Sequence, residues 1–173
     1  SIEVLVADDQ LVIREGLAEL FQEEDIEIVG EAVTGRDAIA KTLKLKPDVL
    51  LMDVMMPDTD GLDALEKIRD KSPQTRVLMM SAHDNPTYVA RSVALSADGF
   101  ILKTATAGEM VDAVKRASRG EPSVDARLNK IKDLLATRLD PTADEVPLTK
   151  REYQVLRHLA FGLSNREIGR SLS

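Results

Sequence analysis

Cysteine is absent from the 173 residues, which excludes disulfide bonds, thiolate nucleophiles and cysteine-ligated zinc or iron–sulfur centres. Aromatic residues make up only 3% of the chain and tryptophan is missing, so a base-stacking surface for single-stranded nucleic acid is disfavoured. The two histidines, His83 and His158, stand far apart in the sequence, so a histidine-rich metal site is not expected. No apolar run approaches the roughly 18 residues of a membrane span, and no basic-then-apolar leader opens the sequence. We therefore expect a cytoplasmic protein without a membrane partner.

The charge that is present is unevenly distributed. The net charge is −7, of which residues 1–120 contribute −8, residues 121–147 contribute −2 and residues 148–173 contribute +3. An acidic body repels polyanions, whereas a short basic tail can face phosphate groups. The hydrophobic fraction of 43% is sufficient for a buried core.

Residues 1–120 alternate short apolar runs with longer amphipathic segments. The runs are typical of strands covered on both faces and occur at Val4–Ala7, Ile26–Gly30, Val49–Met52, Val77–Met80 and Phe100–Leu102. Helical spacing of apolar residues is found at 13–21, 35–45, 60–70, 86–96 and 107–118, the fourth opening at Asn85–Pro86 and the last at a capping box, Thr106 to Glu109. Five such units in order predict an α/β protein with a flavodoxin-like, doubly wound parallel sheet.

A second region begins near Gly120. An amphipathic stripe over residues 124–138 predicts a linker helix, which lies either on the preceding domain or in a contact between two copies of the chain. Residues 140–147 contain two prolines and three acids and indicate a flexible joint. Two capping boxes, starting at Thr149 and Ser164, then predict a helical hairpin. We divide the chain into a domain at 1–120, a linker at 121–147 and an all-α segment at 148–173.

Reactive side chains follow four of the predicted strands: Asp8 and Asp9, Asp53, Ser81, and Lys103. Parallel strands end at the same edge of a sheet, so these side chains are expected to converge. Three carboxylates repel one another unless a cation neutralises them, and an all-oxygen site suits Mg²⁺ (or Mn²⁺). A lysine and a hydroxyl beside such a cluster can clamp a phosphoryl group, and no GxxxxGK[ST] loop is present to hold a nucleoside triphosphate. The pattern predicts a carboxylate that accepts a phosphoryl group.

Five motifs carry these residues and resemble the receiver domain of two-component response regulators over residues 2–118. They are Val4-Leu-Val-Ala-Asp-Asp9, Leu50-Leu-Met-Asp-Val-Met-Met-Pro57, Asp60-Gly61, Leu78-Met-Met-Ser-Ala82 and Asp98-Gly-Phe-Ile-Leu-Lys103. The resemblance implies that a sensor histidine kinase phosphorylates Asp53 and that the protein catalyses only its own phosphorylation and dephosphorylation.

The same resemblance assigns a role to each site residue. Mg²⁺ would be held by Asp8, Asp9, Asp53 and the backbone carbonyl of Met55. Ser81 and Lys103 would contact phosphoryl oxygens, and Phe100 would be an aromatic switch that turns inward when Ser81 moves.

The tail resembles the start of a NarL/FixJ-type, LuxR-family helix-turn-helix domain. The matching motifs are Leu148-Thr-Lys-Arg-Glu-Tyr-Gln-Val-Leu156 and Gly162-Leu-Ser-Asn-Arg-Glu-Ile-Gly169. The resemblance implies a DNA-binding regulator of transcription, and it leaves a homodimer open. Arg151, Arg166 and Arg170 are candidates for DNA-backbone contacts. The family's recognition helix would begin where the sequence stops at Ser173, so we expect this 173-residue chain not to bind DNA specifically.

Two other functions remain to be weighed against the sequence. Aspartyl-phosphate phosphatases and mutases have related α/β folds, but they need a D-x-D nucleophile directly after the first strand, where this chain has adjacent acids. An interaction module that signals by protein contact alone is disfavoured by the helix-turn-helix pattern.

Overall fold

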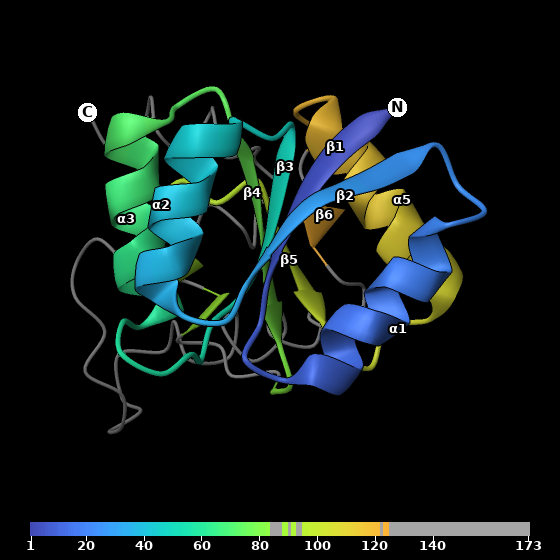
Figure 1. Cartoon of the computed structure of the whole chain (residues 1–173), viewed down its shortest axis with the longest axis horizontal. Helices are drawn as coiled ribbons and strands as arrows, with labels where there is room; N and C mark the ends of the chain where they lie inside the picture. The colour runs from blue at the N-terminus through green and yellow to red at the C-terminus, as the bar shows by residue number, and fades with distance from the viewer. Residues whose placement is uncertain (84–87, 90, 93–94, 122, 125–173) are drawn as a thin grey trace, which may run out of the picture.

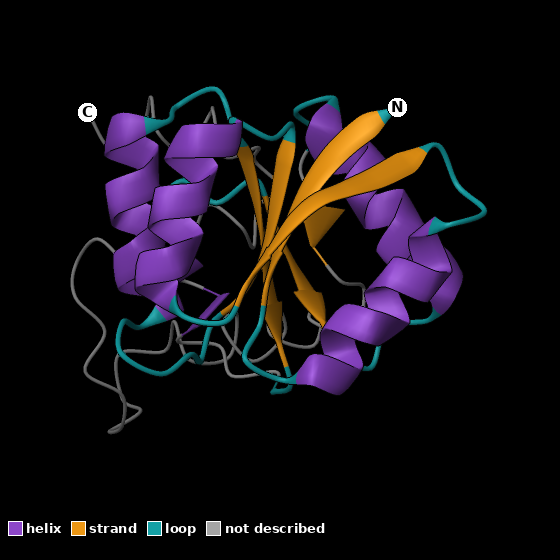
Figure 2. Ribbon diagram, in the orientation of Figure 1, coloured by secondary structure: helices purple, strands orange, loops and turns teal. Residues whose placement is uncertain are grey.

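The structure is a computed structural model that describes residues 1–83, 88–89, 91–92, 95–121 and 123–124. These residues form one parallel sheet with helices on both faces (Figure 1, Figure 2). The strands are β1 (Ile2–Ala7), β2 (Ile26–Ala32), β3 (Val49–Asp53), β4 (Arg76–Ser81), β5 (Gly99–Leu102) and β6 (Ser123–Val124), in the order β2-β1-β3-β4-β5-β6. The predicted flavodoxin-like, doubly wound fold is confirmed.

The helices cover the sheet in two pairs. α2 (Gly35–Leu45) and α3 (Gly61–Lys71) lie on one face, and α1 (Leu11–Phe21) and α5 (Ala107–Ser118) lie on the other (Figure 1). Residues 88–89 and 91–92 are helical and fall within the predicted helix at 86–96, whose opening at Asn85–Pro86 lies outside the described residues. The capping box predicted at the start of α5 is present, with Thr106 and Glu109 each bonded to the other's backbone.

The core has two halves, one on each face of the sheet. Alternate strand residues such as Leu50 and Met52 pack with α2 and α3, whereas Leu51 packs with α1 and α5. All five residues of β3 are buried, as a central strand covered on both faces requires. The continuous apolar runs in the sequence therefore reflect burial on both sides.

The start of the predicted linker helix differs from expectation. Val124, which the helical stripe placed at the beginning of that helix, pairs with Phe100 in the short strand β6. A Cβ on Gly99 would lie 2.3 Å from the carbonyl oxygen of Ser123, so the glycine permits this strand to approach. Residues 125–173, which include the rest of the linker, the helical hairpin and the three candidate DNA-contacting arginines, lie outside the described residues.

The helices can be compared with the length and hydropathy that a membrane span needs. Among the described residues, none of the helices combines the length and the hydropathy that a bilayer span requires.

Candidate functional site

The register of the parallel strands brings the predicted site residues to one edge of the sheet. β1 pairs with β3, and β4 pairs with β3 and β5. Asp53 ends β3, Ser81 ends β4, and Asp8–Asp9 and Lys103 directly follow β1 and β5. The backbone N–H of Lys103 also donates to the carbonyl of Ser81 at 2.7 Å, which holds these two strand ends together.

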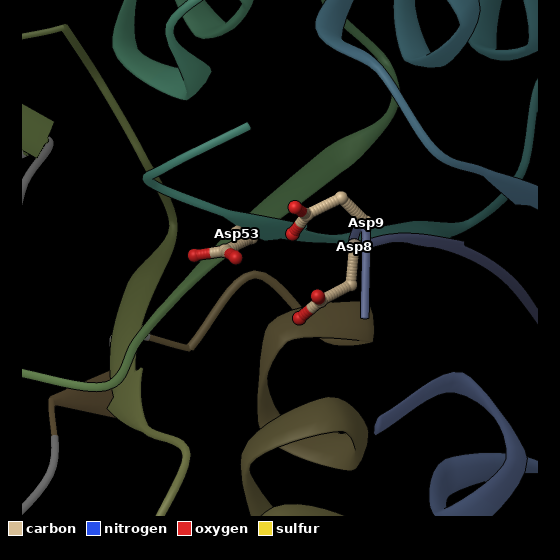
Figure 3. Close-up of side chains that lie close together, drawn as sticks. All are labelled: Asp8, Asp9 and Asp53. Atoms are coloured by element: carbon tan, nitrogen blue, oxygen red, sulfur yellow. The ribbon is translucent and has the colours of Figure 1, made fainter. Parts of the chain in front are cut away.

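Three carboxylates meet at this edge. One oxygen of each of Asp8, Asp9 and Asp53 lies within 4.8 Å of the others. Figure 3 shows these three side chains gathered at the ends of their strands. Asp8 is 0% exposed and Asp53 is 5% exposed, whereas Asp9 faces solvent. The cluster is therefore a half-buried acidic site that is open to solvent on the side of Asp9.

Lys103 is the cation that this site already contains. Its Nζ lies 2.7 Å from Oδ2 of Asp8 and 2.8 Å from Oδ2 of Asp53, and it donates to Oε1 of Gln10 at 3.3 Å. The Lys103 side chain is only 9% exposed. One positive charge shared between two buried carboxylates compensates them in part and leaves the cluster negative overall.

The protonation tendencies follow from this arrangement. Burial raises the pKa of Asp53 and outweighs the opposing effects of Lys103 and of the Met55 N–H, which donates to Oδ1 at 3.1 Å. Burial lowers the pKa of Lys103, but the hydrogen bond to Asp53 and the negative charges of Asp53 and Asp8 together outweigh burial and raise it. The lysine is thus firmly charged, while the Asp53 carboxylate is held in an unfavourable environment.

One buried oxygen lacks a hydrogen-bond donor. Oδ2 of Asp8 is paired in charge with Lys103, but among the described residues no donor meets it with hydrogen-bond geometry. Leaving such an oxygen unsatisfied is costly, and a divalent cation bound by the cluster would satisfy it. An all-oxygen set with one solvent-facing member suits Mg²⁺, which keeps part of its water shell. The residues present therefore fit a divalent cation.

The loop after β3 is held close to Asp53 by the Asp60-Gly61 motif. The Asp60 side chain accepts from the N–H of Leu62 and caps α3. A Cβ on Gly61 would lie 2.2 Å from the carbonyl oxygen of Asp53, so glycine is needed at this close approach. The motif thereby sets the path of the loop that carries Met55.

Ser81 and Phe100 are both buried, each 1% exposed. Oγ of Ser81 accepts a hydrogen bond from the backbone N–H of His83 at 3.1 Å. Phe100 packs in the core half beneath α2 and α3. The Phe100 side chain thus already points inward in this structure, and its role as a switch stays a prediction.

Two residues near the site were missed at the level of the sequence. Gln10 contacts Lys103, and Arg14 donates to the carbonyl oxygen of Asp8 at 2.9 Å. A signal for Arg14 was available, because side chains in the first turn of a helix point back toward its N-terminus. An arginine in the first turn after an acidic pair is placed to reach that pair.

Comparisons with known proteins place the chain in a family. Residues 4–115 match the family model described as "Response regulator receiver domain", and residues 146–173 match "Bacterial regulatory proteins, luxR family". The chain is 39% identical over 170 residues to "Response regulator protein VraR" of Staphylococcus aureus, an alignment covering 97% of this chain and 80% of that protein.

Solved structures show the same relationship. The receiver domain of a putative response regulator, NarL, from Mycobacterium tuberculosis is 36% identical, with a TM-score of 0.68 over 70% of this chain and 98% of that one. RcsB of Salmonella typhimurium, at 23% identity, shares the fold with a TM-score of 0.74, over 99% of this chain and 83% of that one. With the acidic cluster and its lysine at the edge of the sheet, these matches show that the chain belongs to the response regulators and has a receiver domain followed by a LuxR-type DNA-binding region.

Proposed function

We propose that Asp53 accepts a phosphoryl group from the phosphohistidine of a sensor kinase and that this modification controls transcription through the LuxR-type region. Mg²⁺ would be bound by Asp8, Asp9, Asp53 and the carbonyl of Met55. The observation that carries the proposal is the meeting of three carboxylates within 4.8 Å beside a lysine that contacts two of them.

The transfer uses groups already present in the chain. A carboxylate oxygen of Asp53 attacks phosphorus in line, and the bond to the donor breaks with its electron pair leaving on the imidazole nitrogen. When bound, the cation neutralises charge that develops on the phosphoryl oxygens. Lys103, now shared by Asp8 and Asp53, pairs with one phosphoryl oxygen. The Ser81 hydroxyl accepts a hydrogen bond from the His83 N–H, so its own proton is available to donate to a second phosphoryl oxygen.

The charge of the phosphoryl group would change the structure around β4 and β5. An aspartyl phosphate adds a group bearing about −1.5 to −2 charges, by analogy with other phosphorylated side chains. It attracts Ser81 and Lys103, which end β4 and follow β5, and so biases the surface formed by these strands and their helices. Phe100 in β5 packs beneath that surface and is the proposed switch.

The domain boundaries are also part of the proposal. Residues 1–120 form the phosphoacceptor domain, 121–147 the linker, and 148–173 part of the DNA-binding domain, with Arg151, Arg166 and Arg170 as backbone contacts. A homodimer and a cytoplasmic location belong to the same proposal. Catalysis is limited to phosphorylation and dephosphorylation of the protein itself.

Phosphorylation with a small donor tests the proposal. The chain is incubated with acetyl phosphate and Mg²⁺ and its intact mass is measured. We expect a gain of one phosphoryl group, which Asp53→Asn abolishes and the control Asp58→Asn, a change in the following loop, retains. Rapid hydrolysis of p-nitrophenyl phosphate without a stable phosphoprotein would instead support the phosphatase.

A further inference from the structure

Arg14 connects the acidic pair to the neighbouring strand end. From α1 its guanidinium donates through Nη1 to the carbonyl oxygen of Asp8 at 2.9 Å and through Nε to Oε2 of Glu31 at 2.7 Å. The Arg14 side chain is 11% exposed. One rigid fork therefore joins the loop after β1 to the end of β2, a pair of bonds whose geometry suits arginine and not lysine.

The peptide that Arg14 contacts determines where the acidic pair points. Side chains of consecutive residues in extended chain project to opposite sides, yet Asp8 and Asp9 bring their carboxylates to a common point with Asp53. The chain must therefore turn between the two residues, and the orientation of the peptide that joins them fixes this turn. The carbonyl of that peptide is the acceptor of the Arg14 bond.

Two other bonds hold Asp8, but neither contacts the carbonyl of this peptide. The N–H of Asp8 donates to the carbonyl of Ala32 at 3.0 Å, which continues the pairing with β2. Oδ1 of Asp8 accepts from the N–H of Gln10 at 2.9 Å, an Asx turn that fixes the side chain and restrains the peptide from one side. The Asp8 carbonyl is the remaining group, and Arg14 binds it.

We propose that Arg14 is a positioning residue for the divalent-cation site: it orients the Asp8–Asp9 peptide so that both carboxylates face Asp53, without touching the cation or the phosphoryl group. This inference rests on the proposed function, because it requires that the cluster bind Mg²⁺. Arg14, which lies outside the acidic cluster, would thus contribute to the affinity of the cluster for the cation.

The experiment measures Mg²⁺ affinity by calorimetry in the full chain and in Arg14→Met, which keeps the apolar stem and removes both donors. We expect the Kd to rise about tenfold, the lower end of the effect of removing groups that hydrogen-bond to metal ligands. The rate of phosphorylation by acetyl phosphate at saturating Mg²⁺ should stay within about twofold of wild type, because Arg14 does not contact the reacting atoms. Arg119→Met, which removes an exposed arginine, should leave the Kd unchanged.

Two further variants distinguish orientation of the Asp8–Asp9 peptide from a purely structural contact between α1 and β2. Glu31→Gln keeps the bond to Asp8 and an acceptor for Nε, so its Kd should rise less than that of Arg14→Met. Arg14→Lys keeps the charge but only one donor group, so its Kd should lie between wild type and Arg14→Met, and it carries the test if Arg14→Met does not fold.

The outcomes distinguish this inference from the proposed function. Wild-type Kd in both Arg14 variants, with reduced stability toward urea in EDTA, would show that the arginine only braces α1 against β2 and would overturn the inference alone. Absence of Mg²⁺ binding in wild type would overturn the inference and the metal part of the proposed function together.

Discussion

The ammonium group of Lys103 lies 2.8 Å from Oδ2 of Asp53. The same nitrogen is 2.7 Å from Oδ2 of Asp8, so one tethered cation joins the proposed phosphoacceptor to the buried member of the acidic pair. Lys103 directly follows β5, whereas its two carboxylate partners belong to β3 and to the loop after β1. A change in the charge of Asp53 therefore acts directly on Lys103, the residue that follows β5.

Removal of this cation should destabilise the metal-free protein. In Lys103→Met the buried carboxylates lose their shared partner, and we expect unfolding free energy to fall by about 3 kcal/mol, near the lower limit for breaking a buried ion pair. Urea unfolding in EDTA measures this change. Added Mg²⁺ should restore part of the loss, because the cation takes over the compensation of charge.

Lys115→Met is the matched control for Lys103. Lys115 of α5 pairs with Glu24 in the turn that follows α1, and both side chains are about one-third exposed. The expected loss is under about 1 kcal/mol, as for other surface pairs. Equal losses in the two variants would refute a special role for the buried cation.

The raised pKa of Asp53 gives stability a defined pH dependence. Burial raises this pKa above its ordinary value of 3.8, so the folded protein binds the proton more tightly than the unfolded chain does. Stability from this group is present at low pH and is lost as pH rises from about 3.8 through the raised pKa. In EDTA, Asp53→Asn should therefore become progressively more stable than wild type over that window, as urea unfolding at a series of pH values would show.

The difference between the two proteins is the informative quantity, because the other titrating groups largely cancel in it. A difference that stays constant or shrinks with rising pH would contradict the unfavourable environment that we assign to Asp53.

Mg²⁺ should stabilise the fold through Asp9. A ligand that binds only the folded state adds about 1.4 kcal/mol at ten times its Kd. Asp9 faces solvent, so Asp9→Asn should fold normally in EDTA and lose most of this gain. Thermal unfolding with and without Mg²⁺ measures this stabilisation. The control Asp63→Asn, which changes an exposed acid on α3, should keep all of it. Undiminished stabilisation in Asp9→Asn would place the cation elsewhere.

Gly61 should tolerate no side chain. A Cβ there would lie 2.2 Å from the carbonyl oxygen of Asp53, a contact with backbone that cannot move aside cheaply. Gly61→Ala should lower the free energy of unfolding by about 1–3 kcal/mol, the usual effect of overpacking. Gly108→Ala, where the Cβ meets open space in α5, should be neutral or stabilising by up to about 1 kcal/mol. Similar urea midpoints for the two variants would argue against this close approach.

The parts of the structure that could be predicted from sequence are those with a repeating physical cause. Strands buried on both faces appear as unbroken apolar runs such as Val49–Met52, and parallel strands bring their ends to one edge. The meeting of Asp8, Asp53 and Lys103 follows from these two facts. The family motifs then add roles, such as that of Phe100, which the structure leaves as predictions.

The parts that could not be predicted depend on single contacts. β6 has only two residues, too few for a periodic signal, and the helical stripe assigned Val124 to a helix instead. Gln10 and Arg14 act through the directions of individual side chains, which hydropathy patterns do not encode. The comparisons show the LuxR-type region, but the linker helix and the helical hairpin lie outside the described residues, so their structure stays a prediction.

The most direct test of the account is to locate the phosphoryl group on the chain. After incubation with acetyl phosphate and Mg²⁺, borohydride reduction converts an aspartyl phosphate to homoserine, which peptide mass spectrometry can locate. We predict homoserine at position 53 alone, none in EDTA and none in Asp53→Asn. Homoserine at position 8 or 9 with Asp53 unmodified would contradict the assignment of Asp53 as the phosphoacceptor.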